Sequence, residues 1–137
     1  MAGEISPLVA TLNVALGGAA GSVLRYHVGR WIGQMAGTGN TFPWGTLTVN
    51  IVGSLAMGAL VGWLARGTIA APNAEPLRLL IGVGLLGGFT TFSAFSSELI
   101  TMLHRGQTML ALCYAAASLV AGMAAVIIGL VAAQSAS

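Results

Sequence analysis

Charged residues are scarce in this sequence. Only 6% of the 137 residues carry a charge; the five basic residues are all arginines and the three acidic ones are all glutamates. Soluble domains usually have about a quarter of their residues charged, and so few scattered arginines cannot form the basic patch that binds nucleic acid. The hydrophobic content of 56% and the mean hydropathy of +0.90 therefore indicate a membrane protein with no nucleic-acid partner.

The sequence also lacks the residue groupings that catalysis requires. An enzyme needs a nucleophile with its base, a metal cluster or a pair of carboxylates, but His27 and His104 lie at the ends of apolar segments without cysteine or aspartate nearby. No GxxxxGKS phosphate-binding loop is present. The single cysteine, Cys113, excludes an intrachain disulfide and is interpreted as a small packing residue. We therefore expect neither an enzyme nor an ATP-driven pump.

Four long apolar segments fill most of the chain, at residues 8–32, 43–65, 77–103 and 107–133. The hydrocarbon core of a bilayer is about 30 Å thick and requires about 20 apolar residues per helix. Backbone polar groups inside lipid must be hydrogen-bonded within their own segment, and the alternating pattern of membrane strands is missing. The sequence predicts an all-α fold in which residues 1–137 form a single four-helix transmembrane domain.

Arginines are nearly balanced between the two ends of the predicted helices. One side holds Arg25, Arg30 and Arg105, and the other side holds Arg66 and Arg78. An excess of basic residues normally fixes which side of a membrane protein faces the cytoplasm, and three against two is hardly an excess. The balance favours the hypothesis that the chain inserts in both orientations, so that two identical subunits pair antiparallel.

Glycines spaced four residues apart occur in two of the segments, at Gly17 and Gly21 and at Gly58 and Gly62. This spacing lets helix backbones approach closely in lipid. The close approach is either between two subunits or within one chain, and the spacing alone does not separate these alternatives.

Polar side chains recur at four-residue intervals in the second and fourth segments. The second segment places Thr46, Asn50 and Ser54 on one helical face, and the fourth does the same with Tyr114 and Ser118. Such side chains often link membrane helices through hydrogen bonds. Because two helices carry them here, the alternative is that they line a shared polar path.

The third segment contains the unusual stretch GGFTTFSAFSSE at residues 87–98. Paired glycines followed by paired threonines lower helix propensity, so the stretch favours a local break in the third helix. Carbonyls released by a break need a partner in lipid, and a small cation is one such partner. The alternative is a mild bend in which threonine hydroxyls satisfy the carbonyls.

The same stretch holds three of the four phenylalanines of the chain. Phe92 and Phe95 share a helical face, and Ser93 and Ser96 form a parallel row. The positive edge of an aromatic ring can face an anion, and hydroxyls can donate hydrogen bonds to it. Ordinary packing is the alternative explanation for the two rings.

Taken together, these stretches resemble the Fluc (CrcB-type) fluoride channels. The resemblance rests on GGAAGSVLRY at 17–26, FPWGTLTVNIVGS at 42–54, the stretch at 87–98, and Tyr114 with Ser118. It implies a four-helix protein with a broken third helix that assembles in the cell inner membrane as an antiparallel, dual-topology homodimer. It also implies a fluoride-selective channel for passive export and a structural sodium ion (Na+) at the dimer centre.

The resemblance also assigns roles to individual residues. The ring edges of Phe92 and Phe95 are expected to face fluoride. The other expected pore residues are Asn50, Thr46, Ser93, Ser96, Tyr114 and Ser118. The backbone carbonyls of Gly87 and Thr90 are expected to bind the sodium ion. Arg25 is expected to lie in the aqueous vestibule, although a helix-end anchor would explain this arginine equally well.

One position departs from the family pattern. Members often carry another serine or threonine on the fourth helix one turn after the residue matched by Ser118, whereas this chain has Gly122. The resemblance therefore leaves the far end of the polar path unassigned.

Two functions from other classes remain as alternatives. A proton-coupled multidrug exporter needs a buried glutamate in its first helix, where this chain has Asn13 as an internal polar group. A structural membrane subunit would use the polar stripes only to link helices. Glu98 is expected to be a helix-end charge or a structural hydrogen-bonding group rather than a catalytic one.

Overall fold

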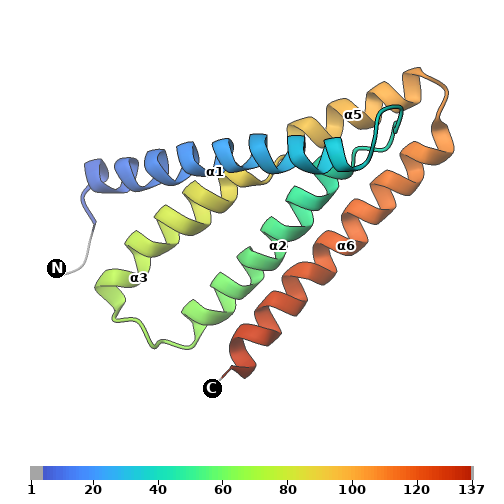
Figure 1. Ribbon diagram of the computed structural model, residues 1–137. Coiled ribbons are helices and arrows are strands. Elements are labelled where there is room, and N and C mark those ends of the chain that lie inside the picture. Colours follow the sequence, from blue (N-terminus) through green and yellow to red (C-terminus); the bar gives the residue numbers. More distant parts are fainter. Residues whose placement is uncertain (1–4, 137) are drawn as a thin grey trace.

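Helices build the fold throughout residues 5–136, the range that the computed structural model describes (Figure 1). Residues 1–4 and 137 lie outside that range. The first two helices are α1 (Pro7–Met35) and α2 (Trp44–Ala65), and the last is α6 (Thr108–Ser135). Together with the third stretch, Ala71–His104, these make four stretches that are long and apolar enough to cross a membrane. The predicted all-α fold with four membrane-length segments is confirmed.

The third stretch is divided into several elements. They are α3 (Ala71–Leu77), the π-helix η1 (Arg78–Leu86), the short α4 (Gly87–Phe89) and α5 (Phe92–His104). Between α4 and α5, Thr90 and Thr91 have extended backbone, with φ/ψ of −81°/159° and −150°/124°. The Thr91 hydroxyl accepts a hydrogen bond from the Ala94 N–H at 3.2 Å and so begins α5. The paired glycines lie in α4, and Phe89 separates them from the extended residues.

Glycine lets the helix backbones touch. A Cβ at Gly21 of α1 would lie 2.0 Å from the carbonyl oxygen of Leu85 in η1, and a Cβ at Gly58 of α2 would lie 2.0 Å from that of Val126 in α6. No side chain fits at such distances. The other glycine of each predicted pair approaches the same neighbouring helix. Packing within one chain therefore accounts for the glycine spacing, which was the second of the two alternatives.

Few side chains are buried, and one cluster of them lies where α2, α5 and α6 meet. Leu47, Met102, Ala111 and Tyr114 form this cluster, with exposed fractions from 0% to 7%. Elsewhere large apolar side chains cover the surface, including Leu8 and Val120 at 68% and 69% exposed. Such a surface would be unfavourable in water but suits contact with lipid chains. The exposure pattern agrees with a multi-pass membrane protein.

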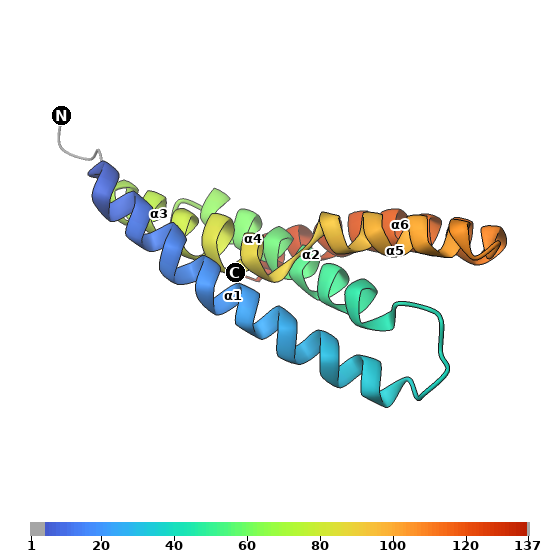
Figure 2. The same cartoon turned by 90° about the horizontal axis from the view of Figure 1, so that it is seen from above.

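The connections between helices lie at two opposite ends of the bundle. The α1–α2 and α5–α6 connections lie at one end, whereas the start of α1 and the end of α6 lie toward the other (Figures 1 and 2). At that second end, Arg66 donates from Nη1 to the carbonyl oxygens of Ala133 and Ala136. An arginine in this place satisfies carbonyls that the last turn of α6 leaves without helical partners.

Candidate functional site

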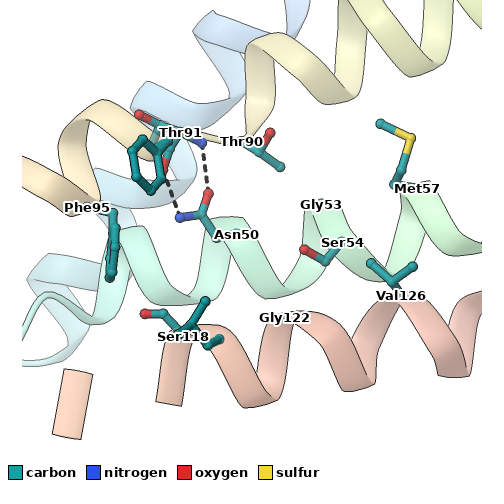
Figure 3. Close-up of a pocket in the computed structure, with 12 residues that line it drawn as sticks. Asn50, Gly53, Ser54, Met57, Thr90, Thr91, Phe95, Ser118, Gly122 and Val126 are labelled. Atoms are coloured by element: carbon teal, nitrogen blue, oxygen red, sulfur yellow. Dashed lines mark hydrogen bonds between the residues drawn. The ribbon is translucent and has the colours of Figure 1, made fainter. Parts of the chain in front are cut away.

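Asn50 of α2 holds the extended residues in place. Its Nδ2 donates to the carbonyl oxygen of Thr91 at 2.9 Å, and its Oδ1 accepts from the Thr91 N–H at 2.8 Å (Figure 3). In a continuous α-helix the Thr91 N–H would bond to the carbonyl of Gly87. The asparagine therefore satisfies both backbone groups of Thr91, and one amide proton of the predicted pore asparagine remains for another partner.

The carbonyls near the extended residues differ in how they are satisfied. Thr90 donates twice to the carbonyl of Leu86, from its N–H at 2.9 Å and from its hydroxyl at 3.0 Å. The carbonyl of Leu86 therefore keeps its helical donor and gains a hydroxyl as well, so this hydroxyl does not satisfy a carbonyl that the extended residues release. The carbonyl of Gly87 loses its helical donor because the Thr91 N–H bonds to Asn50. Gly87 is exposed and Thr90 is half-buried in the protomer.

Glu98 joins three helices. Thr46 of α2 donates to its Oε1 at 2.6 Å, and Tyr114 of α6 donates to its Oε2 at 2.7 Å. A hydroxyl has one proton and an ionised carboxylate only accepts. In this arrangement, therefore, neither of the two predicted pore hydroxyls has a proton left for an anion. The structural hydrogen-bonding role expected of Glu98 is confirmed by these two bonds.

The extent of the Glu98 network was missed from the sequence. The sequence predicts that Thr46 and Tyr114 are pore residues, and it does not predict that both bind Glu98. A usable signal was present, since Glu98 is the one carboxylate inside the apolar part of the third segment. An ionisable side chain in a membrane segment usually pairs with another polar group inside the protein.

The two predicted pore phenylalanines lie together but in different surroundings. The ring centroids of Phe92 and Phe95 are 5.8 Å apart. Phe95 also packs on Tyr114, with a centroid distance of 5.1 Å, whereas Phe92 is 79% exposed. Ordinary packing thus accounts for one side of Phe95. Nothing in the described part of the protomer covers the exposed Phe92 ring.

Ser93 and Ser96 form hydrogen bonds at the start of α5. The Ser96 hydroxyl donates to the carbonyl of Phe92 at 2.9 Å, and the Ser93 hydroxyl lies 3.3 Å from that of Thr91. Within residues 5–136, neither serine lines the groove described next. The structure therefore does not bring these two predicted pore residues together with the others.

A groove of about 340 Å³ lies between α2, α6 and the extended residues (Figure 3). Asn50, Ser118 and the two phenylalanine rings line it, so four of the predicted pore residues meet there. The Ser118 hydroxyl oxygen is buried and has no hydrogen-bond partner among the described residues. Such an oxygen is uncommon in proteins and indicates a ligand or water that completes it.

A second cavity, of about 300 Å³, lies between α1 and α2. Its lining includes Ser22, the half-buried Arg25 and Thr46, together with Thr91, which also lines the groove. Thr91 is therefore a lining residue of both cavities. Arg25 gives this second cavity a positive charge, as a vestibule for anions requires.

A sequence model of the family described as "CrcB-like protein, Camphor Resistance (CrcB)" matches residues 12–130 of this chain. The chain belongs to the CrcB family. The match covers most or all of each membrane-length stretch and every residue that is predicted to form the pore, and the predicted family is confirmed.

Curated relatives in the CrcB family carry a functional name. A protein of Novosphingobium aromaticivorans is 53% identical over 123 residues, which cover 90% of this chain and 94% of that protein. One of Erythrobacter litoralis is 49% identical over 128 residues, with 92% and 93% covered. Both are named "Fluoride-specific ion channel FluC". Relatives named as ion channels make this a family of channels rather than enzymes, as the sequence predicted.

Proposed function

We propose that this CrcB-family chain forms a fluoride-selective channel that exports fluoride passively across the cell inner membrane. The observation that carries the proposal is the 53% identity, over nine-tenths of the chain, to a protein named as a fluoride-specific ion channel. The groove supports it, because its polar groups are neutral donors and its rings include the exposed Phe92.

Neutral donors suit the permeation of fluoride. The ion is small and strongly hydrated, so a path must replace its water with hydrogen bonds without binding it too tightly to leave. The unpaired hydroxyl of Ser118, the second amide proton of Asn50 and the positive edges of Phe92 and Phe95 are of this kind. A fixed arginine inside the groove would hold fluoride and slow its passage.

Arg25 acts on fluoride before the ion reaches the donors of the groove. It lines the second cavity, and Thr91 lines both that cavity and the groove. A positive group in a cavity raises the local concentration of anions. The groove itself is lined by neutral residues, so the conducting path carries no fixed charge.

We further propose an antiparallel homodimer with a sodium ion at its centre, held by the carbonyls of Gly87 and Thr90. Carbonyl oxygens are suitable ligands for a hard cation, and the Gly87 carbonyl has lost its helical donor. Hard cations take about six oxygen ligands, so two carbonyls from one subunit are too few. A second copy would bring the carbonyl ligands to four, leaving about two positions for other oxygen donors such as water, and would also cover the exposed Phe92 ring.

Flux measurements on the purified protein in liposomes test this function. We expect fluoride efflux without an imposed proton gradient, little chloride efflux, and loss of fluoride efflux when sodium is absent on both sides. Efflux that requires a proton gradient would instead support a coupled transporter. Absence of fluoride efflux from liposomes that hold the folded dimer would overturn the channel assignment.

A further inference from the structure

Most of the polar groups near the proposed fluoride path already donate their protons to protein acceptors. Thr46 and Tyr114 donate to Glu98, and Ser96 donates to the carbonyl of Phe92. Thr90 donates to the carbonyl of Leu86. Because each hydroxyl has a single proton, these groups have none to offer an anion in this arrangement.

Ser54 differs from them. It lies on α2 one turn after Asn50, is half-buried, and lines the groove. A serine in a helix commonly donates to the carbonyl four residues earlier, as Ser96 does. Within residues 5–136, the Ser54 hydroxyl forms no hydrogen bond of this kind. The neighbouring polar groups Thr46, Asn50, Ser96 and Tyr114 all form hydrogen bonds there. It therefore shares with Ser118 the property of an unpaired hydroxyl at the groove.

Ser54 lies opposite the glycine of α6 that departs from the family pattern. A Cβ built on Gly122 would lie 3.8 Å from the Ser54 hydroxyl oxygen, which is an ordinary contact distance. Ser54 and Gly122 face each other across the groove from α2 and α6 (Figure 3). A hydroxyl on a side chain at position 122 would thus lie in the same part of the groove as the Ser54 hydroxyl.

From this geometry we infer that Ser54 supplies, from α2, the fluoride hydrogen bond that α6 lacks at Gly122. The inference rests on the proposed channel function and names one more ligand of the same path. The path then passes from Ser118 on α6 to Ser54 on α2. Beyond Ser54 the groove is lined by Met57 and Val126, which cannot donate. Ser54 is accordingly the last donor in the groove, and without its hydroxyl fluoride has no hydrogen-bond donor at that end.

The test moves the hydroxyl from one helix to the other. Ser54→Ala is expected to lower fluoride efflux from liposomes by about threefold to tenfold, the factor that one hydrogen bond of ordinary net strength gives. Adding Gly122→Ser to Ser54→Ala is expected to restore most of the efflux. The matched control adds Gly122→Ala instead, which supplies the carbon without the hydroxyl, and efflux is expected to stay low.

The outcomes separate this inference from the proposed function. If the wild-type chain shows no fluoride efflux, the channel assignment fails first. If the wild type conducts and Ser54→Ala conducts equally well, Ser54 is not a ligand and the inference is wrong. Failure of Gly122→Ser to restore efflux, with the dimer intact by size-exclusion chromatography, would also overturn it, since a packing role predicts no rescue from another helix.

A second substitution covers the case in which Ser54→Ala does not fold. Ser54→Cys keeps nearly the same shape but replaces the hydroxyl by a weak donor. Reduced fluoride efflux from the folded Ser54→Cys protein is expected, and unchanged efflux would contradict the inference.

Discussion

At the scale of single residues, two groups of polar side chains can be distinguished by their hydrogen bonds. Those of one group bond to other protein groups and hold the structure together, and those of the other group have hydroxyls that are free to bind a ligand. Glu98 accepts the protons of Thr46 and Tyr114, and Asn50 satisfies both backbone groups of Thr91. These bonds fix the positions of α2, α5 and α6 around the buried cluster. The hydroxyls of Ser118 and Ser54 remain open beside them. Spacing along a helix places Thr46, Asn50 and Ser54 in one stripe and Tyr114 and Ser118 in another, and it does not distinguish the two groups.

Replacement of Glu98 by alanine should destabilise the protein. The change leaves the Tyr114 hydroxyl, on a side chain that is 0% exposed, without its acceptor. An unsatisfied buried polar group costs about 1–3 kcal/mol, so the midpoint of thermal unfolding in detergent should fall. The control is Glu75→Ala, which removes only an exposed ion pair with Arg78 and should leave the midpoint nearly unchanged. Equal midpoints for the two variants would show that the Glu98 network is not structural.

Replacement of Asn50 by aspartate should block fluoride. The carboxylate can still accept from the Thr91 N–H, so one of the two bonds that hold Thr91 is expected to survive. It cannot donate to the Thr91 carbonyl, and it places a negative charge in a groove proposed for an anion. Because repulsion between like charges at the protein surface is worth several kcal/mol, fluoride efflux should fall by more than about tenfold. Asn40→Asp, in the α1–α2 connection, is the control and should conduct normally.

At the scale of helices, the apolar segments predicted the spanning stretches well because length and hydropathy are local properties. Each of the four apolar runs is long and apolar enough to cross a membrane. The π-helix η1 was not predicted, since its i→i+5 bonds form where it packs against α1 and leave no mark on residue spacing. The helix that packs against each glycine pair could not be predicted for a similar reason. From the sequence, Gly58 could contact a helix of another subunit as well as α6 of the same chain.

The same limit applies to the site. Asn50, Phe92 and Phe95 could be predicted because a motif and a family resemblance name them, and the structure brings them to one groove. For Ser54, the sequence leaves open whether the hydroxyl links helices or lines the path. Its importance depends on its distance from Gly122, a residue on a helix that is far away along the chain.

The contact between α2 and α6 gives a prediction at this scale. Gly58→Ala places a Cβ 2.0 Å from the Val126 carbonyl oxygen, so the two helices must separate. Overpacking of this kind costs about 1–3 kcal/mol. Gly122→Ala, 3.8 Å from the Ser54 oxygen, is the matched control, and its better helix propensity should leave the protein as stable or more so. Thermal unfolding in detergent compares them, and a Gly58→Ala protein as stable as the control would contradict the close packing.

At the scale of the whole molecule, the charges at the two ends of the bundle decide how the chain inserts. The end with the α1–α2 and α5–α6 connections is the end to which Arg25, Arg30 and Arg105 belong. At the opposite end, Arg66 bonds to carbonyls at the end of α6 and Arg78 pairs with Glu75. Neither end carries a clear excess of basic residues, which supports the proposed insertion in both orientations. A few added lysines should therefore fix the orientation.

Two variants with opposite charge bias test the antiparallel pair. Thr41→Lys with Thr108→Lys adds charge at one end, and Thr68→Lys with Asn73→Lys adds it at the other; all four positions are exposed. Each variant alone should insert in one orientation, shown by reporter fusions at its C-terminus, and so should form few antiparallel pairs. Fluoride efflux from loaded cells should then be low for either variant and recover when both are made together. Cells are required, because detergent extraction would let subunits of one kind pair again in any orientation. Full efflux from one variant whose orientation is fixed would rule out the antiparallel dimer, while leaving the fluoride path within each subunit to be judged by the substitutions above.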